Sequence, residues 1–243
     1  MFGYDEVLED VRFAFTDRFG GASQAPYGEL NLGSAAGDEG SAIAENFRLL
    51  ADEFRVRSEA VIRVSQVHGN NVHLVAEGDE LPVLPMPSAD ALVTTRTDVA
   101  LCVRAADCLP VLLADPGNGV IGAAHSGRRG LYSGVVPATV EAMRELGAER
   151  ITAVLGPYAC GKCYEVPAEM RAEVAERAPA SYAETSWGTP SIDVAAGVIA
   201  QLGELDVRVI DATSCTIESE DLYSYRREGP VSGRMAGLVR LHP

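Results

Sequence analysis

The chain has 243 residues, enough for one large domain or two small ones that bury a substantial core. Apolar residues make up 47% and charged residues 23%, which is the composition of a soluble globular protein. A net charge of −15 argues against binding to a nucleic-acid backbone or to an anionic lipid surface.

The hydrophobic pattern predicts many short strands with a few helices between them. Strands are expected where runs of apolar and β-branched residues are bounded by Gly, Asn, Asp or Pro, at 11–18, 60–68, 71–77, 91–95, 99–105, 109–115, 119–125, 151–155 and 207–213. A first helix should begin at Ser41 as its N-cap, because Ile43, Phe47, Leu50 and Phe54 recur at helical spacing. Further helices are expected at 134–146, 167–178 and 191–205.

This order of elements is not a regular alternation of strand and helix. It favours an α+β fold with mixed sheets and flanking helices. No internal repeat or linker interrupts it, so we expect a single domain over residues 1–243.

The sequence also carries signals about location. It opens on the acidic "MFGYDEVLED", where a secretory signal would be basic, and its apolar runs are shorter than the roughly 20 residues of a membrane span. Five cysteines at irregular spacings are then best interpreted as reduced thiols in the cytoplasm. Cys160 and Cys163 form a CxxC, but without a second pair we interpret them as two partly buried thiols near a turn.

Polar residues interrupt the apolar stretch "LCVRAADCLPVLLADPGNGVIGAAHSGRRG", residues 101–130. Asp107, Cys108 and His125 lie there, and His68 closes another expected strand that opens into a glycine turn. If His68, Cys108 and His125 converge, they supply the three ligands of a catalytic zinc whose fourth position is left for water. Asp107 could orient one of the imidazoles. Taken singly, a Cys in an apolar run or an isolated His is more often a structural residue.

Two arginine pairs, Arg128–Arg129 and Arg226–Arg227, are suited to binding phosphate or carboxylate, although surface salt bridges are the more common use of such pairs.

Seven blocks, in order from about residue 11 to 240, resemble the YfiH-like, or laccase-domain, protein family. They are "GGASQAPYGELNLG", "QVHGNNV", "ADALVTT", "RAADCLPVLLAD", "GAAHSGRRG", "LGPYACGKCYEV" and "YSYRREGPVSGRMAGLVRL". In that family the histidine of "QvHg", the cysteine of "ADC" and the histidine of "aaHaG" bind one zinc, which implies His68, Cys108 and His125 as ligands here. The family fold is a layered α/β/β/α arrangement of mixed sheets.

The resemblance implies a purine nucleoside enzyme. Adenosine, inosine and methylthioadenosine would be cleaved by phosphate to the free base and ribose 1-phosphate, and adenosine would also be deaminated to inosine. Two positions depart from the family pattern. Arg128 stands where the family usually has Trp, and Asn46–Phe47 stands where it usually has Asn-Arg, with an arginine only at Arg48.

An older name for the family is multicopper polyphenol oxidase. A multicopper centre needs about ten histidines, and this chain has four, so we expect copper only as an adventitious occupant of the zinc site. Zinc suits deamination as a source of hydroxide, whereas phosphorolysis also needs a bound phosphate. Candidates for binding substrate and phosphate are Arg48, Arg226 and Asn31.

Two other interpretations use the same residues. A metal-independent cysteine hydrolase or amidase would use Cys108 as nucleophile and His125 as base, with Asp107 or Asn31 orienting the imidazole. A zinc-stabilised interaction domain would need a closed metal site, which three ligands do not provide.

Overall fold

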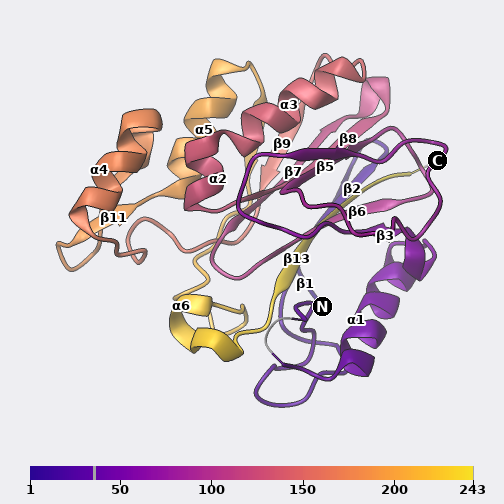
Figure 1. Ribbon diagram of the computed structural model, residues 1–243, viewed down its shortest axis with the longest axis horizontal. Helices are drawn as coiled ribbons and strands as arrows, with labels where there is room; N and C mark the ends of the chain where they lie inside the picture. Colours follow the sequence, from indigo (N-terminus) through magenta and orange to yellow (C-terminus); the bar gives the residue numbers. More distant parts are fainter. Residues whose placement is uncertain (35–36, 243) are drawn as a thin grey trace.

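The computed structural model describes residues 1–34 and 37–242 of the chain (Figure 1). Within them the chain forms two mixed β-sheets, a separate two-stranded hairpin and α-helices on both outer faces. No helix in these residues is both long enough and apolar enough to cross a membrane.

The first sheet has five strands in the order β1-β2-β13-β6-β3. Its central strand β13 is antiparallel to both neighbours, and β3 runs parallel to β6 at the edge. The strands are β1 (Phe2–Leu8), β2 (Val11–Thr16), β13 (Met235–Leu241), β6 (Ala100–Ala105) and β3 (Val61–Ile62).

The second sheet has six strands in the order β12-β9-β7-β8-β5-β4. The middle pairs are antiparallel, and the outermost pair at each edge is parallel. The strands are β12 (Arg208–Asp211), β9 (Thr152–Leu155), β7 (Leu109–Asp115), β8 (Val120–Ser126), β5 (Ala91–Thr94) and β4 (Val72–Leu74), and the separate hairpin is β10 (Tyr182–Glu184) with β11 (Pro190–Ile192).

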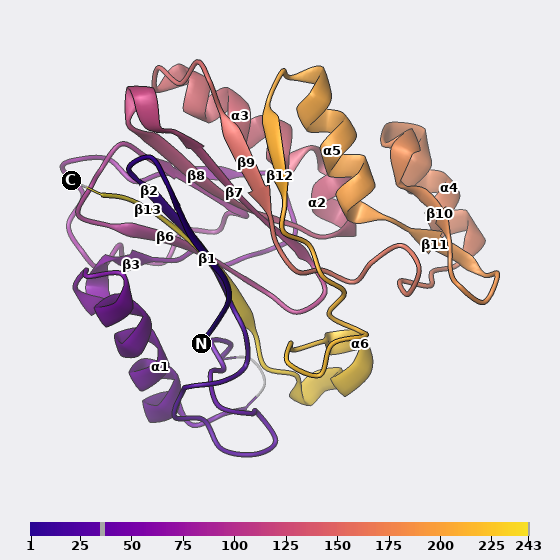
Figure 2. The same ribbon diagram turned by 180° about the vertical axis from the view of Figure 1, so that it is seen from behind.

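The helices lie outside the two sheets, as Figures 1 and 2 show. They are α1 (Gly40–Glu53), α2 (Arg128–Ser133), α3 (Val135–Glu145), α4 (Ala168–Arg177), α5 (Val194–Glu204) and α6 (Tyr225–Glu228), with 3-10 turns at Ser58–Ala60, Pro116–Asn118, Pro179–Ser181 and Gly229–Val231. Helix α1 packs its buried face on the first sheet, where Leu50 and Phe47 share a cluster with Leu238. Helices α3 and α5 cover the second sheet.

Between the sheets lies a core to which both contribute. Phe13 and Val239 of the first sheet share one buried cluster with Leu112 and Ile121 of the second. The order of layers is therefore helix, sheet, sheet, helix, which confirms the expected α+β fold with a layered α/β/β/α arrangement.

Several local expectations differ from the structure. The strand expected at 60–68 ends at Ile62, because only two of its residues pair with β6. Ser41 does not cap α1, since the helix begins at Gly40 and its N-cap is Glu39. Strands β1, β10, β11 and β13 and helices α2 and α6 were not expected as elements, and the helix expected at 191–205 begins only at Val194 because β11 ends at Ile192.

Candidate active site

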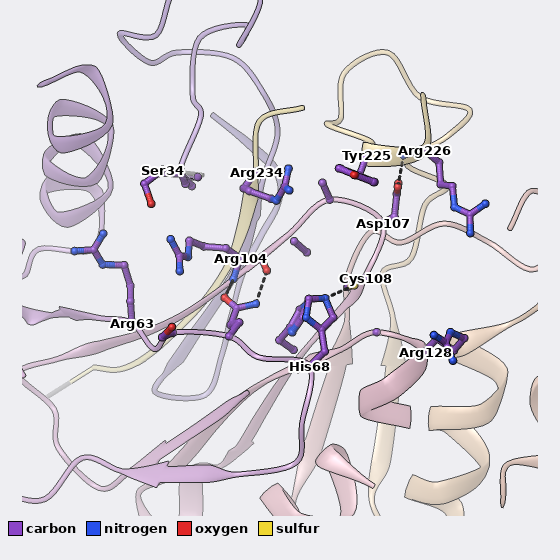
Figure 3. Close-up of a pocket in the computed structure, with 18 of the residues that line it drawn as sticks. Ser34, Arg63, His68, Arg104, Asp107, Cys108, Arg128, Tyr225, Arg226 and Arg234 are labelled. Atoms are coloured by element: carbon purple, nitrogen blue, oxygen red, sulfur yellow. Dashed lines mark hydrogen bonds between the residues drawn. The ribbon is translucent and has the colours of Figure 1, made fainter. Parts of the chain in front are cut away.

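The side chains of His68, Cys108 and His125 meet at one end of the second sheet. His125 is the next-to-last residue of β8, and Cys108 directly precedes β7, the antiparallel neighbour of β8. His68 comes from the turn that follows β3. One ligand atom from each residue lies within 4.8 Å of the other two. The Nε2 of His68 is 4.0 Å from the Sγ of Cys108 (Figure 3). The centroids of the His68 and His125 imidazoles are 4.9 Å apart.

Asp90, which directly precedes β5, orients the imidazole of His125 and holds the backbone turn that carries His68. Its fully buried carboxylate lies 3.0 Å from the Nδ1 of His125. The same carboxylate accepts the backbone N–H groups of Val67, His68 and Gly69, at 3.2, 2.9 and 2.6 Å. The Nδ1 of His125 is thereby occupied, which leaves its Nε2 available as a ligand. Sequence reasoning did not identify Asp90, although it is the second residue of the "ADALVTT" block.

The site is electrostatically coupled. Burial would raise the pKa of the Cys108 thiol, but the imidazoles of His125 and His68 reverse this effect and lower it to about 6. Burial likewise opposes the charge on His125, but Cys108 and Asp90 raise its pKa to about 9. Burial works against the Asp90 carboxylate as well, yet His125 and the backbone N–H groups hold its pKa below the usual range. The three groups therefore favour a thiolate beside a positive partner.

Two residues of the site have a backbone conformation that L-residues rarely adopt. The φ angles of His68 and Asp107 are +63° and +85°. The His68 turn is held by Asp90, as described above. The Asp107 carboxylate accepts the Thr216 hydroxyl and the Arg226 N–H, both at 2.7 Å. Asp107 therefore holds the turn before Cys108 and does not orient an imidazole, which corrects the expectation from the sequence.

Gly127 leaves open the space between the ligands. A Cβ at this position would stand 2.7 Å from the Sγ of Cys108 and 3.5 Å from the Cδ2 of His68. Any side chain here would fill the point toward which the sulfur and the imidazole are directed.

These residues line a cavity of about 760 Å³. Five arginines also line it, whereas Asp107 is the only acidic residue among the lining residues. The arginines come from separate segments of the chain and are Arg63, Arg104, Arg128, Arg226 and Arg234 (Figure 3). In a chain with a net charge of −15, this is a local concentration of positive charge.

None of these five guanidiniums forms a salt bridge with a carboxylate in the described part of the chain. Burial lowers the pKa of Arg63 and of Arg234, and Arg104 lowers both further. The thiolate of Cys108 acts in the opposite direction on Arg234, which places that guanidinium within electrostatic reach of the sulfur. The cavity therefore favours an anion beside the His-Cys-His cluster.

Two of the residues expected to bind substrate lie elsewhere. Arg48 is on the exposed face of α1, where its guanidinium pairs with Glu45 and Asp52, and it does not line the cavity. Asn31 is fully buried, and its Oδ1 accepts the backbone N–H groups of Gly33 and Arg234 at 2.8 and 2.9 Å. It shapes the rim of the cavity through the backbone. Arg226 does line the cavity, as expected.

The two arginine pairs and the four histidines contribute only some of their members to the cavity. Arg128, at the start of α2, lines the cavity, and its exposed neighbour Arg129 does not. Arg227 donates to the carbonyl groups of Thr216 and Ser219 at 2.6 and 2.7 Å. Only two of the four histidines, His68 and His125, belong to the lining of the cavity.

Comparisons with known proteins agree with this architecture. Residues 12–242 match the family described as multi-copper polyphenol oxidoreductase laccase. The chain is 52% identical to a Streptomyces coelicolor protein named purine nucleoside phosphorylase, over 99% of this chain and 100% of that one. A Corynebacterium glutamicum protein with the same activity name is 46% identical, over 99% and 98% of the two chains.

Solved structures give the same result for the fold. The crystal structure of the Neisseria meningitidis protein NMB0706 matches with a TM-score of 0.85 and 32% identity, over 97% of this chain and 96% of that one. YlmD from Geobacillus stearothermophilus matches with a TM-score of 0.83 and 26% identity, over 97% and 93%. With a family match over nearly its whole length, this chain belongs to the laccase-domain, YfiH-like family.

Proposed function

We propose that this chain is a zinc-dependent purine nucleoside phosphorylase that cleaves adenosine, inosine and methylthioadenosine to the free base and ribose 1-phosphate. One observation carries the proposal: a cluster of two imidazoles and one thiol opens into a cavity lined by five arginines, none of which forms a salt bridge with a carboxylate among the described residues. The names of the relatives from Streptomyces and Corynebacterium support the same activity.

The donor set fits zinc. Two imidazoles with one thiolate are ligands that zinc accepts, and three protein ligands leave one position free, as in catalytic sites. The Nδ1 of His125 is held by Asp90, and Gly127 keeps the space between the ligands clear. Zinc bound by His68, Cys108 and His125 would supply a Lewis acid at the floor of the cavity.

In phosphorolysis a phosphate oxygen bonds to C1′ of the ribose while the bond from C1′ to the purine nitrogen breaks, and the base leaves with the bonding electrons. Phosphate must therefore be held beside the sugar. Arg234 and Arg104 are the guanidiniums that we assign to this role, because Arg234 lies within electrostatic reach of both Cys108 and Arg104. Arg226, whose guanidinium lies 4.7 Å from the centroid of the Tyr164 ring, lines the same cavity.

The cavity also suits the size and chemistry of a nucleoside. Its volume of about 760 Å³ lies within the range of small-molecule sites. Phe47, Met86 and Tyr164 give it apolar and aromatic walls on which a purine ring can stack. Adenosine deamination to inosine belongs to the same proposal, since a zinc with an open position is what that hydrolysis requires.

The test is chromatography of adenosine incubated with zinc-loaded protein, with and without phosphate. Adenine and ribose 1-phosphate that form only with phosphate are the expected products of phosphorolysis. Inosine in both samples is the expected product of deamination. Adenosine that stays intact in every sample would refute the nucleoside assignment.

A second candidate is a metal-independent cysteine hydrolase or amidase. The arrangement Asp90–His125–Cys108 favours it, because a carboxylate orients an imidazole beside a thiol whose pKa is about 6. The third donor, His68, is unexplained by that mechanism. The two candidates differ in their response to a chelator: a zinc enzyme should lose its activity, whereas a cysteine hydrolase should stay active without metal and lose its activity only when Cys108 is alkylated.

A further inference from the structure

A second cluster of metal-binding side chains lies outside the cavity. Cys160 and Cys163 come from the loop after β9, and Cys215 and Glu218 come from the segment after β12. One ligand atom of each lies within 4.8 Å of the others, and none of the four residues lines the cavity. We propose that these four residues form a second metal site, which binds zinc independently of the His-Cys-His cluster.

The four donors complete a closed coordination shell. Zinc with thiolate ligands at about 2.3 Å separates the sulfurs of a tetrahedral site by about 3.8 Å. Donor atoms that already lie within 4.8 Å of one another need only small side-chain rotations to reach that spacing. Three thiolates and one carboxylate leave no open position, which is the arrangement of a structural site.

The spacing of the residues supports the same conclusion. Two residues separate Cys160 from Cys163, and two separate Cys215 from Glu218, so each segment presents a pair of donors on one turn. The turn at Cys160 depends on Gly161, where a Cβ would stand 2.8 Å from the Oδ2 of Asp193. The CxxC therefore does have a second pair, which a search for cysteines alone does not find because one member is a glutamate.

The donor atoms of the cluster suit a divalent cation, because thiolates and carboxylates are both ligands of zinc. The backbone N–H of Lys162 donates to the Cys160 sulfur, which favours a thiolate at that atom. A divalent cation would displace the thiol protons and offset half of the negative charge that three thiolates and one carboxylate carry.

The position of the cluster indicates what the metal would do. The two segments are already joined by backbone hydrogen bonds from Tyr158 to Ser214 and from Thr216 to Tyr158, at 3.0 and 2.9 Å. The same segments hold Asp107, whose carboxylate accepts the Thr216 hydroxyl and whose carbonyl accepts the Ala159 N–H. Zinc would lock this pair of segments and, through Asp107, the turn that carries Cys108.

The test is the zinc content of the chain, measured by elemental mass spectrometry. The protein is first reduced and loaded with zinc, and loosely bound metal is then removed. The whole chain should hold about two zinc ions, and the double variant Cys160→Ser/Cys163→Ser about one. Cys108→Ser should also hold about one, because it removes a ligand of the other site. The matched control is Cys102→Ala, since Cys102 is a buried thiol in neither cluster, and it should hold as much as the unaltered chain. A double variant with undiminished zinc would overturn the proposal.

A second measurement needs no variant and covers the case in which the double variant fails to fold. Two samples of the unaltered chain are treated with iodoacetamide, one loaded with zinc and one from which a chelator has removed the zinc. Peptide mass spectrometry then gives the extent of alkylation at each cysteine. Cys160, Cys163 and Cys215 should be protected by zinc and modified after its removal. Equal modification under both conditions, or a disulfide between Cys160 and Cys163 in the zinc-loaded protein, would contradict the proposal.

Discussion

Replacing Asp90 by asparagine should weaken zinc binding at the His68–Cys108–His125 site without unfolding the chain. The Asp90 carboxylate accepts from His125 on one oxygen, from the Val67 and Gly69 N–H groups on the other, and from the His68 N–H. An asparagine keeps the shape of the side chain but turns one of its two acceptors into a donor. Every arrangement of the amide then sets a donor against a donor.

Each orientation of the amide damages the site in its own way. With its NH2 group toward Val67 and Gly69, two backbone N–H groups lose their acceptor. With its NH2 group toward His125, the Nδ1 must become the acceptor, so the imidazole proton moves to Nε2, the nitrogen required as a ligand. Loss of such an orienting partner costs about 10- to 100-fold in metal affinity, or about 1.4–2.7 kcal/mol.

The assay is competition for zinc between the protein and a chromophoric chelator, with thermal unfolding of the metal-free protein measured beside it. Asp115→Asn is the matched control. Asp115 is also a buried carboxylate that accepts backbone N–H groups, from Glu149 and Arg150, but it lies at the far end of β7. Zinc affinity should fall for Asp90→Asn alone. An equal loss in both variants, or none in either, would refute the role given to Asp90.

Three further outcomes are expected. Cys108→Ser should abolish turnover while the protein still unfolds cooperatively on heating, because the site lies at the cavity and not in the core; an unfolded variant would favour the interaction-domain interpretation. Arg234→Ala should raise the KM for phosphate about 10-fold or more, because it removes a charge-assisted bidentate contact. Arg48→Ala is the control and should leave this KM unchanged. Steady-state kinetics with varied phosphate compares the two variants. In metal-free protein, the rate of alkylation of Cys108 should be half-maximal near pH 6 and decrease below it, because the thiolate is lost as pH falls through its pKa. A midpoint near the ordinary thiol pKa of 9 would contradict the coupling to His125.

The sequence predicts the elements whose pattern depends on local burial. Strands β5 to β9 are apolar runs bounded by turn residues, and the buried face of α1 follows the helical period. The strand expected at 60–68 is too long. Its apolar and polar residues alternate as in a strand, but β6 pairs with only Val61 and Ile62. The single-domain organisation over residues 1–243 stays a prediction.

The site shows a different limit. Spacing along the chain could not bring His68 to Cys108, since the contact depends on two sheets. The residue types raised the cluster as one interpretation, and the resemblance to a family made it the expected one. Asp90 is missed because a lone carboxylate before a strand has no sequence signature. Of the five arginines that line the cavity, Arg128 and Arg226 belong to pairs that the sequence indicated, and the other three are missed for a similar reason. Arg63, Arg104 and Arg234 come from separate segments that only the fold brings together.

Strand β13 has a consequence for biosynthesis. It is the third of five strands in its sheet, and its backbone bonds to the Thr16 hydroxyl across a separation of 220 residues. During translation, the edges of β2 and β6 that pair with β13 have no hydrogen-bonding partner until Met235–Leu241 has left the ribosome. Assembly of this sheet is thus a late, non-local event, and such edges are the surfaces on which unfinished chains pair wrongly with one another.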